Sequence, residues 1–219
     1  MEAFNNIKMS QLTFKFPFKK NYLKREFYVS SNNFEVYKLI EAYPNWPDKW
    51  VNIYGSKGCG KTHLANILKD KVSINYFNPS QIKNESIKNL NNCNFIIIDN
   101  YDHDIEENLL YTLLNHSKQL NNYLLITSPI PLSKMKIKLK DLKSRLSSFI
   151  EVGIGLPTDD LLRVIISKSF SEKQIELSVR NLEFIIKNID RSYEKIFKFI
   201  KEIDKVSLSS GKSININLI

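Results

Sequence analysis

The segment Gly55–Thr62 constrains the fold of this chain more than any other feature of its sequence. It reads G-x-x-x-x-G-K-T, follows the apolar run Trp50–Tyr54 and leads into a helical pattern over Lys61–Lys69. Glycines let a backbone wrap a polyphosphate with its N–H groups pointing inward, and the start of the following helix adds a positive end. The pattern therefore predicts a strand, a phosphate-binding loop and a helix in succession.

Within this loop, individual residues have distinct expected roles. Lys61 can reach the β- and γ-phosphates of a nucleotide, and Thr62 can hold Mg²⁺. A glycine-rich turn that binds nothing is the alternative, and the strand before the loop and the helix after it argue against that alternative. The residues expected to bind the nucleotide here are Gly55, Gly58, Gly60, Lys61, Thr62 and His63.

A second acidic feature follows one strand later. The apolar run Phe95–Ile98 ends in Asp99 and Asn100. A buried strand that delivers Asp99 beside the loop is expected to supply the second Mg²⁺ anchor and to take part in catalysis. Many ATPases of this type have another acidic residue at the position of Asn100, where it polarises the attacking water. Because an amide is a poor base, the sequence predicts ATP binding with slow intrinsic hydrolysis.

Three further positions fit the same scheme more weakly. Thr127 and Ser128 end an apolar run, where a polar side chain can touch the γ-phosphate or water, although an ordinary strand-end turn explains them equally well. Arg145 precedes the last apolar run of this region, and Arg191 opens a long helical pattern. A surface salt bridge is the usual explanation for a single arginine, so the case for these two rests on their order along the chain.

Apolar runs alternate with amphipathic stretches through the middle of the chain, and this alternation predicts a parallel sheet with helices on both faces. Expected strands are Trp50–Tyr54, Ile74–Phe77, Phe95–Ile98, Leu124–Thr127 and Phe149–Val152, and expected helices are Lys61–Lys69, Pro79–Leu90, Asp104–Leu120 and Lys138–Ser147. Ser31 is expected to cap an earlier helix. We therefore expect an extended segment at 1–21, an α/β nucleotide-binding domain with a five-stranded parallel sheet at 22–156, and a small all-helical lid domain at 157–219.

Charge and composition set limits on the class of protein. The formal net charge is +9, which fits a nucleic-acid partner, but the lysines are scattered and the densest stretch, Lys134–Lys143, also fits a solvated face. No apolar run approaches the roughly 20 residues that span a bilayer, and Cys59 and Cys93 cannot make a disulfide framework. We expect a cytoplasmic protein with no membrane partner.

Taken in chain order, these motifs resemble the AAA+ module of the bacterial replication initiator DnaA. The resemblance covers about residues 20–219. It rests on the phosphate loop, the I-I-I-D-N strand at 96–100, the L-L-I-T-S strand at 124–128, the K-S-R motif at 143–145 and Arg191. The chain resembles in particular the short DnaA-related proteins of the Hda family. Those proteins have an N-terminal peptide that binds the sliding clamp, and residues 11–16, Gln-Leu-Thr-Phe-Lys-Phe, look like that peptide.

The resemblance implies a regulatory function. Bound to the sliding clamp (the β subunit of DNA polymerase III) on DNA, Hda-type proteins promote ATP hydrolysis by DnaA and so prevent re-initiation. It implies ADP or ATP with Mg²⁺ as cofactors, Arg191 as a phosphate-sensing lid arginine and Arg145 as an arginine finger acting in trans on DnaA. DNA would be contacted mainly through the clamp, and a homo-oligomer is left open. The implied clamp-binding residues are Gln11, Leu12, Phe14 and Phe16.

Two other functions stay open from the sequence. One is a self-sufficient ATPase, such as a DnaA-like protein or a helicase loader, acting directly in replication or on DNA, and Asn100 argues against it. The other is a nucleic-acid-binding module that uses the +9 charge directly, whose affinity would fall steeply with salt.

Overall fold

The computed structural model describes residues 23–69, 72–88, 90, 93–173 and 177–210. Within them, five parallel strands form one sheet in the order β2-β3-β4-β1-β5. The strands are β1 (Trp50–Tyr54), β2 (Asn75–Phe77), β3 (Phe95–Ile98), β4 (Tyr123–Ser128) and β5 (Ile150–Gly153). The predicted five-stranded parallel sheet is therefore confirmed. The sequence also shows a short apolar alternation over Ser213–Ile219, which lies outside the described residues.

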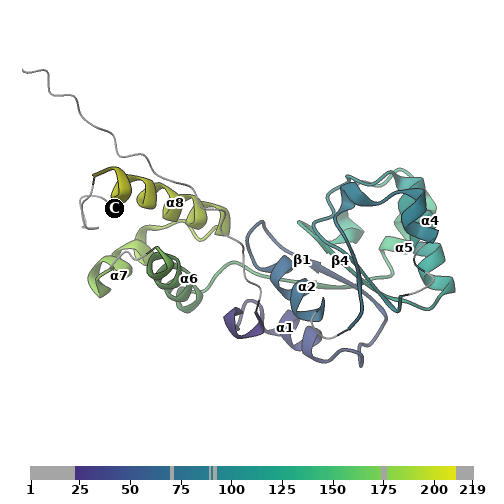
Figure 1. Cartoon of the computed structure of the whole chain (residues 1–219), viewed down its shortest axis with the longest axis horizontal. Coiled ribbons are helices and arrows are strands. Elements are labelled where there is room, and N and C mark those ends of the chain that lie inside the picture. The colour runs from purple at the N-terminus through teal and green to yellow at the C-terminus, as the bar shows by residue number, and fades with distance from the viewer. Residues whose placement is uncertain (1–22, 70–71, 89, 91–92, 174–176, 211–219) are drawn as a thin grey trace, which may run out of the picture.

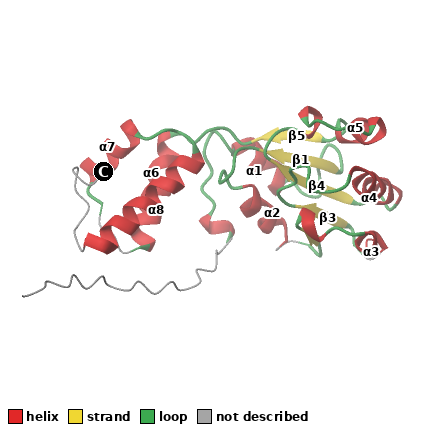
Figure 2. Cartoon of the chain, turned by 90° about the horizontal axis from the view of Figure 1, so that it is seen from above, coloured by secondary structure: helices red, strands yellow, loops and turns green. Residues whose placement is uncertain are grey.

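Helices cover both faces of the sheet. Figure 2 shows α1 (Phe34–Glu41) and α2 (Lys61–Lys69) on one face, and α3 (Asn84–Lys88), α4 (Glu107–Gln119) and α5 (Lys140–Leu146) on the other. Side chains along a strand point alternately to the two faces. In β3, Phe95 and Ile97 accordingly join the core beneath α1 and α2, while Ile96 and Ile98 join the core beneath α3, α4 and α5. Every residue of β3 is buried, as expected for a strand covered on both faces.

Two local predictions are wrong. Ser31 does not cap α1, because the helix begins at Phe34 with Asn33 in the N-cap position. The Asn33 side chain instead accepts a hydrogen bond from the Ser30 backbone N–H (2.9 Å) and donates to the Tyr28 carbonyl (3.0 Å), which folds the approach to the helix into a turn.

The expected helix over Pro79–Leu90 is also not continuous. It is divided into a 3-10 turn, η2 (Pro79–Gln81), and the short α3, because Ile82 adopts an extended conformation between them. Asn78 and Gln81 form a capping box around η2, so the hydrogen bonds that would extend a helix are used locally. Two more 3-10 turns are η1 (Lys24–Glu26) and η4 (Leu132–Lys134).

Three helices follow the sheet: α6 (Asp159–Glu172), α7 (Val179–Asn188) and α8 (Tyr193–Ser210). They pack around a core of their own and lie at one end of the molecule, with α4 and α5 at the other end (Figure 1). Thr158 caps α6 and Ser178 caps α7 through side-chain hydrogen bonds. The domain boundaries after residues 21 and 156 stay predictions. Among the described residues, no helix has the length and apolar character needed to cross a bilayer.

The start of α8 is tied to the chain ahead of α1. The Asn32 side-chain amide donates to the Tyr193 hydroxyl (2.7 Å) and to the Gly155 carbonyl (3.2 Å). Tyr193 and Leu161 also belong to the apolar cluster that α1 and α2 form on their face of the sheet. These contacts position the helical part of the chain beside the loop that follows β1.

Candidate nucleotide-binding site

The loop between β1 and α2 needs glycine at two positions. Gly58 has φ +89° and Gly60 has φ +106°, a region that other residues rarely adopt. A Cβ at Gly58 would lie 3.1 Å from ring carbons of Phe197 in α8, and one at Gly60 would lie 3.0 Å from the ring of Phe27. Gly55 is equally confined, with Cys59 Sγ only 2.9 Å from where its Cβ would be. The loop is therefore enclosed by aromatic rings from elements before α1 and after β5.

Lys61 lies inside the curve of this loop. Its side chain is 6% exposed, and Nζ donates to the carbonyls of Gly55 (2.6 Å) and Ser56 (3.2 Å). Burial raises the pKa of the neighbouring Cys59 thiol, although the Lys61 charge opposes the shift. The ammonium thus sits at the centre of the backbone that is predicted to wrap the phosphates.

Asp99 is the centre of a hydroxyl cluster at the carboxyl edge of the sheet. It is 2% exposed and accepts hydrogen bonds from Thr62 Oγ1 (2.8 Å), Tyr76 Oη (2.7 Å) and Thr127 Oγ1 (2.6 Å). These residues come from α2, β2 and β4, whereas Asp99 follows β3. The carboxyl ends of parallel strands meet at this edge, where α/β proteins bind ligands. The sequence-based pairing of Thr62 with Asp99 is therefore present in the structure.

The donors of this cluster fit Mg²⁺. A threonine hydroxyl and a carboxylate are oxygen ligands, and Mg²⁺ is usually held by one or two carboxylates together with phosphates and waters. No group of three or more His, Cys, Asp or Glu side chains that could hold a metal occurs in the described part of the chain. Thr62 and Asp99 would therefore share the ion with the nucleotide rather than enclose it in an all-protein cage.

Tyr76 and Ser128 differ from the sequence-based expectation. Tyr76 is not among the predicted site residues, yet its hydroxyl donates to Asp99. The register of β2 on β3 pairs Tyr76 with Ile97, two residues before Asp99 and on the same face, and the sequence carries no signal for this pairing. Ser128, in contrast, is fully buried and bonds Asn52 Nδ2 (2.8 Å) and the Ile130 carbonyl (2.7 Å), so its hydroxyl serves the core.

Asn100 lies directly against the Thr62–Asp99 pair. Its φ is +64°, a conformation that asparagine tolerates better than most residues, and its backbone N–H donates to Thr127 Oγ1 (2.7 Å). Its Nδ2 is 3.1 Å from Asp99 Oδ2 and 3.4 Å from Thr62 Oγ1. An uncharged amide therefore occupies the position beside the expected metal ligands.

His63 contacts the N-terminal side of the molecule. Its Nε2 is 3.0 Å from the Leu23 carbonyl, and its ring meets Phe27 edge-on with centroids 5.3 Å apart. Its predicted contact with nucleotide stays a prediction, as do the roles assigned to Gly55, Gly58, Gly60, Lys61 and Thr62.

The two predicted arginines lie apart from the loop residues described above. Arg191, in the turn before α8, is 55% exposed and forms an ion pair with Asp159 (2.8 Å). Arg145, on α5, donates from Nε to Asn115 Oδ1 (3.1 Å) on α4. Helix α5 covers the face of the sheet opposite to α2, so Arg145 is not a neighbour of Lys61 in the same chain (Figure 2). The implied clamp-binding residues Gln11, Leu12, Phe14 and Phe16 lie outside the described residues.

Sequence comparisons find distant relatives. No protein-family model matches the chain. An uncharacterised protein of Haemophilus influenzae is 24% identical over 203 residues, covering 87% of this chain and 88% of that protein. The chromosomal replication initiator DnaA of Buchnera aphidicola is 28% identical over 248 residues, covering 97% of this chain and 52% of the initiator. The chain thus spans about half the length of this DnaA relative.

Solved structures share the fold at low sequence identity. Domain III of Thermotoga maritima DnaA superposes with a TM-score of 0.72 at 17% identity, covering 93% of this chain and 95% of that one. A DnaA bound to AMPPCP and single-stranded DNA gives 0.65 at 21% identity, with 85% and 65% covered. The RuvB Holliday junction branch migration motor of Thermotoga maritima gives 0.63 at 19% identity, again with 85% and 65% covered. The chain therefore has the AAA+ fold seen in DnaA and RuvB, and its sequence is distantly similar to that of DnaA.

Proposed function

We propose that this chain is a nucleotide-binding regulator of replication initiation of the Hda type. Bound to the sliding clamp, it would stimulate ATP hydrolysis by DnaA and so prevent re-initiation. The observation that carries the proposal is the position of Asn100 beside Thr62 and Asp99. Thr62 and Asp99 are suited to binding a nucleotide with its metal ion, whereas the Asn100 amide is poorly suited to hydrolysing that nucleotide. The resemblance to Hda proteins supplies the partners, and the distant relation to DnaA supports the process.

Nucleotide binding is the first step of the proposal. ADP or ATP would place its phosphates in the curve of the loop, where Lys61 Nζ would exchange its contacts with the Gly55 and Ser56 carbonyls for phosphate oxygens. Thr62 and Asp99 would hold Mg²⁺, and a bound Mg²⁺ ion neutralises charge on the phosphates. The hydrogen bonds from Tyr76 and Thr127 fix the orientation of the Asp99 carboxylate before any ligand arrives.

Weak intrinsic hydrolysis is the second step. A water attacking the γ-phosphate needs a group that orients it and accepts its proton. The Asn100 amide would orient a water through hydrogen bonds but is not basic. The bound nucleotide would then act mainly as a structural element that holds the loop, α8 and the Thr62–Asp99 edge together.

The third step is the action of Arg145 on a partner. The Asn115 side chain holds its Nε, and its two terminal nitrogens make no hydrogen bond within the described chain. A guanidinium anchored in this way can present its outer edge to phosphates held by another protein. Stimulation of DnaA in trans needs an arginine positioned away from its own phosphate loop, and the location of α5 supports that requirement.

A clamp-binding experiment tests this proposal. The full chain, a variant lacking residues 1–20, and the double variant Gln11→Ala/Leu12→Ala are mixed with the sliding clamp, and the captured protein is measured. Only the full chain should be retained, because an extended peptide with apolar anchors is a common mode of recognition. All three should have the same thermal stability, since a large loss in the double variant would mean that these side chains pack on the protein's own core.

A second candidate function is direct binding of DNA, and one surface favours it. Lys134, Lys136, Lys138 and Lys140 are all exposed, while the alternate residue Met135 is buried against the core. The Glu107 carboxylate holds this segment by accepting hydrogen bonds from the backbone N–H groups of Lys138 (3.0 Å) and Leu139 (2.7 Å). These two hydrogen bonds lower the pKa of Glu107. Lys134 ends η4 and Lys140 begins α5, so the four exposed lysines line the short connection between these two elements. Affinity for DNA without the clamp that falls steeply with salt would favour this function.

A further inference from the structure

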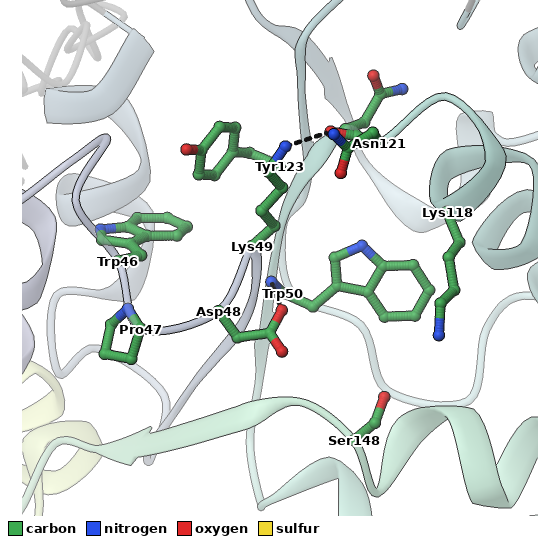
Figure 3. Close-up of a pocket in the computed structure, with 10 residues that line it drawn as sticks. Trp46, Pro47, Asp48, Lys49, Trp50, Lys118, Asn121, Tyr123 and Ser148 are labelled. Carbon is green, nitrogen blue, oxygen red and sulfur yellow. Dashed lines mark hydrogen bonds between the residues drawn. The ribbon is translucent and has the colours of Figure 1, made fainter.

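A pocket opens at the edge of the sheet opposite to the phosphate loop. It lies where β1 and β4 begin and is lined by residues 46–50, by residues from the end of α4 to the start of β4, and by Ser148. Its volume is about 500 Å³ (Figure 3). The phosphate loop follows the other end of β1, after Tyr54. The pocket is therefore separate from the proposed nucleotide site and has no role in the function argued above.

Two polar groups that line this pocket have no partner. Trp50 is 7% exposed, and its indole Nε1 makes no hydrogen bond within the described chain, whereas Trp46 Nε1 donates to the Leu39 carbonyl (2.7 Å). Asn122 is 3% exposed, and its buried Nδ2 has no acceptor among the described residues. The Trp50 Nε1 is not among the fully buried unpaired atoms, so a molecule in the pocket can reach it, whereas Asn122 Nδ2 is enclosed by the protein. An acceptor bound in the pocket would satisfy the Trp50 indole N–H, and a polar donor gains from such a partner when water is excluded.

Cationic side chains also line the pocket. Figure 3 shows Lys49 and Lys118 on either side of the Trp50 indole. Lys49 Nζ donates to the Asn121 carbonyl (3.0 Å) and lies 5.1 Å from the centroid of the Tyr123 ring. An ammonium has three donors, so this contact positions Lys49 and leaves two N–H groups. The only carboxylate of the lining is Asp48, which accepts the Trp50 backbone N–H (3.3 Å), so two lysines face one aspartate.

We propose that this pocket binds a small organic anion. Its carboxylate or phosphate oxygens would accept hydrogen bonds from Trp50 Nε1, Lys49 and Lys118, and its apolar body would lie against the rings of Trp46, Pro47 and Tyr123. Donors predominate over acceptors in the lining, so an anion satisfies it better than a neutral or cationic molecule does. The volume is in the range of small-molecule sites, and an inorganic ion alone would fill little of it.

The chain contains two tryptophans, and both line the pocket, so their indole N–H signals in a nitrogen-labelled NMR spectrum report on it directly. Trp46→Phe and Trp50→Phe assign the two signals. Phenylacetate and phenylphosphate should each shift the Trp50 signal saturably, and the Trp46 signal should move much less because its N–H is already bonded to Leu39. The ratio of the two affinities distinguishes a carboxylate ligand from a phosphate ligand. Benzyl alcohol, the neutral match, should leave the Trp50 signal in place.

Lysine variants test the charge. Lys49→Gln and Lys118→Gln should each weaken phenylphosphate binding about fivefold to tenfold, as expected for loss of one partly exposed charged contact. Lys140→Gln, which changes an exposed lysine at the start of α5, should have no effect and serves as the control. A Trp50 signal that never moves, moves equally with benzyl alcohol, or responds unchanged in both lysine variants would overturn the proposal. A response to inorganic phosphate as strong as that to phenylphosphate would mean an adventitious ion only.

Discussion

Asp99 shows how single residues build the candidate site. A carboxylate that is almost completely removed from water is costly unless hydrogen bonds satisfy it. Three hydroxyls, from Thr62, Tyr76 and Thr127, meet this need. The sequence identified Thr62 and Asp99 because a known loop pattern precedes them. It did not identify Tyr76, because β2 is short and nothing in its composition reveals which strand it pairs with.

Lys61→Ala removes the one ammonium inside the loop. We expect loss of ADP and ATP binding with the fold retained, because the charge that should contact the phosphates is gone while the backbone of the loop is unchanged. Isothermal titration with each nucleotide measures the binding, and circular dichroism checks the fold. Lys57→Ala, at an exposed lysine of the same loop, is the matched control and should bind normally. ADP affinity unchanged by Lys61→Ala would remove the basis for the site.

Asn100→Asp replaces the amide beside Asp99 with a carboxylate of the same shape. Aspartate also tolerates the positive φ of this position, so the backbone should keep its conformation. Because general-base catalysis contributes about 10²–10⁴-fold in rate, intrinsic ATP hydrolysis should rise by about tenfold or more, measured as phosphate release at saturating ATP. A variant that binds ATP normally and hydrolyses it no faster would show that the second carboxylate is not what limits this protein.

At the scale of elements, the alternation of apolar runs and amphipathic stretches was enough to locate all five strands. Predicted and observed ends differ by about one residue, as for Ile74–Phe77 against the observed Asn75–Phe77. The order of the strands was not predictable, because it depends on packing between residues distant in sequence. Helix starts were the weakest point. Asn33 and Asn78 use their side chains in turns whose hydrogen bonds compete with helix formation.

Arg191 belongs to the turn that joins α7 and α8, and its test concerns how these helices meet the loop. Arg191→Ala should lower nucleotide affinity less than Lys61→Ala does, because this side chain is exposed and already paired with Asp159. Loss of the exposed ion pair should change the free energy of unfolding by only about 0–1 kcal/mol. Titration calorimetry and urea unfolding measure the two effects. Complete loss of binding would mean that Arg191 contacts the phosphates as directly as Lys61.

At the scale of the whole molecule, the sheet with its two layers of helices separates the three proposed functions in space. The carboxyl edge holds the Thr62–Asp99 group, α5 presents Arg145 on the opposite face from α2, and the amino edge holds the pocket around Trp50. The fold was predictable because the phosphate-loop motif and the alternation of apolar runs with amphipathic stretches both indicated a parallel sheet covered by helices. The pocket was not, because it is assembled from turns that are separate in sequence and carry no motif.

Action in trans through Arg145 is the central claim, and phosphoryl transfer explains why. Charge develops on the transferred phosphoryl group, and an arginine supplied by a partner can raise the rate by about 10³–10⁵-fold. Arginine suits the task because it stays charged and presents a planar fork of donors. Arg145→Lys should therefore recover little activity, because a point charge on a flexible stem does not reproduce the fork.

The most direct measurement is the rate of ATP hydrolysis by DnaA in the presence of the sliding clamp on DNA, with this protein or its Arg145→Ala variant added. The unaltered protein should stimulate hydrolysis, and Arg145→Ala should not, although it still binds nucleotide and the clamp. Lys143→Ala, which removes an exposed lysine from the same helix, is the control and should stimulate normally. If Arg145→Ala stimulates DnaA as strongly as the unaltered protein, Arg145 is not the finger and the proposed mechanism is contradicted.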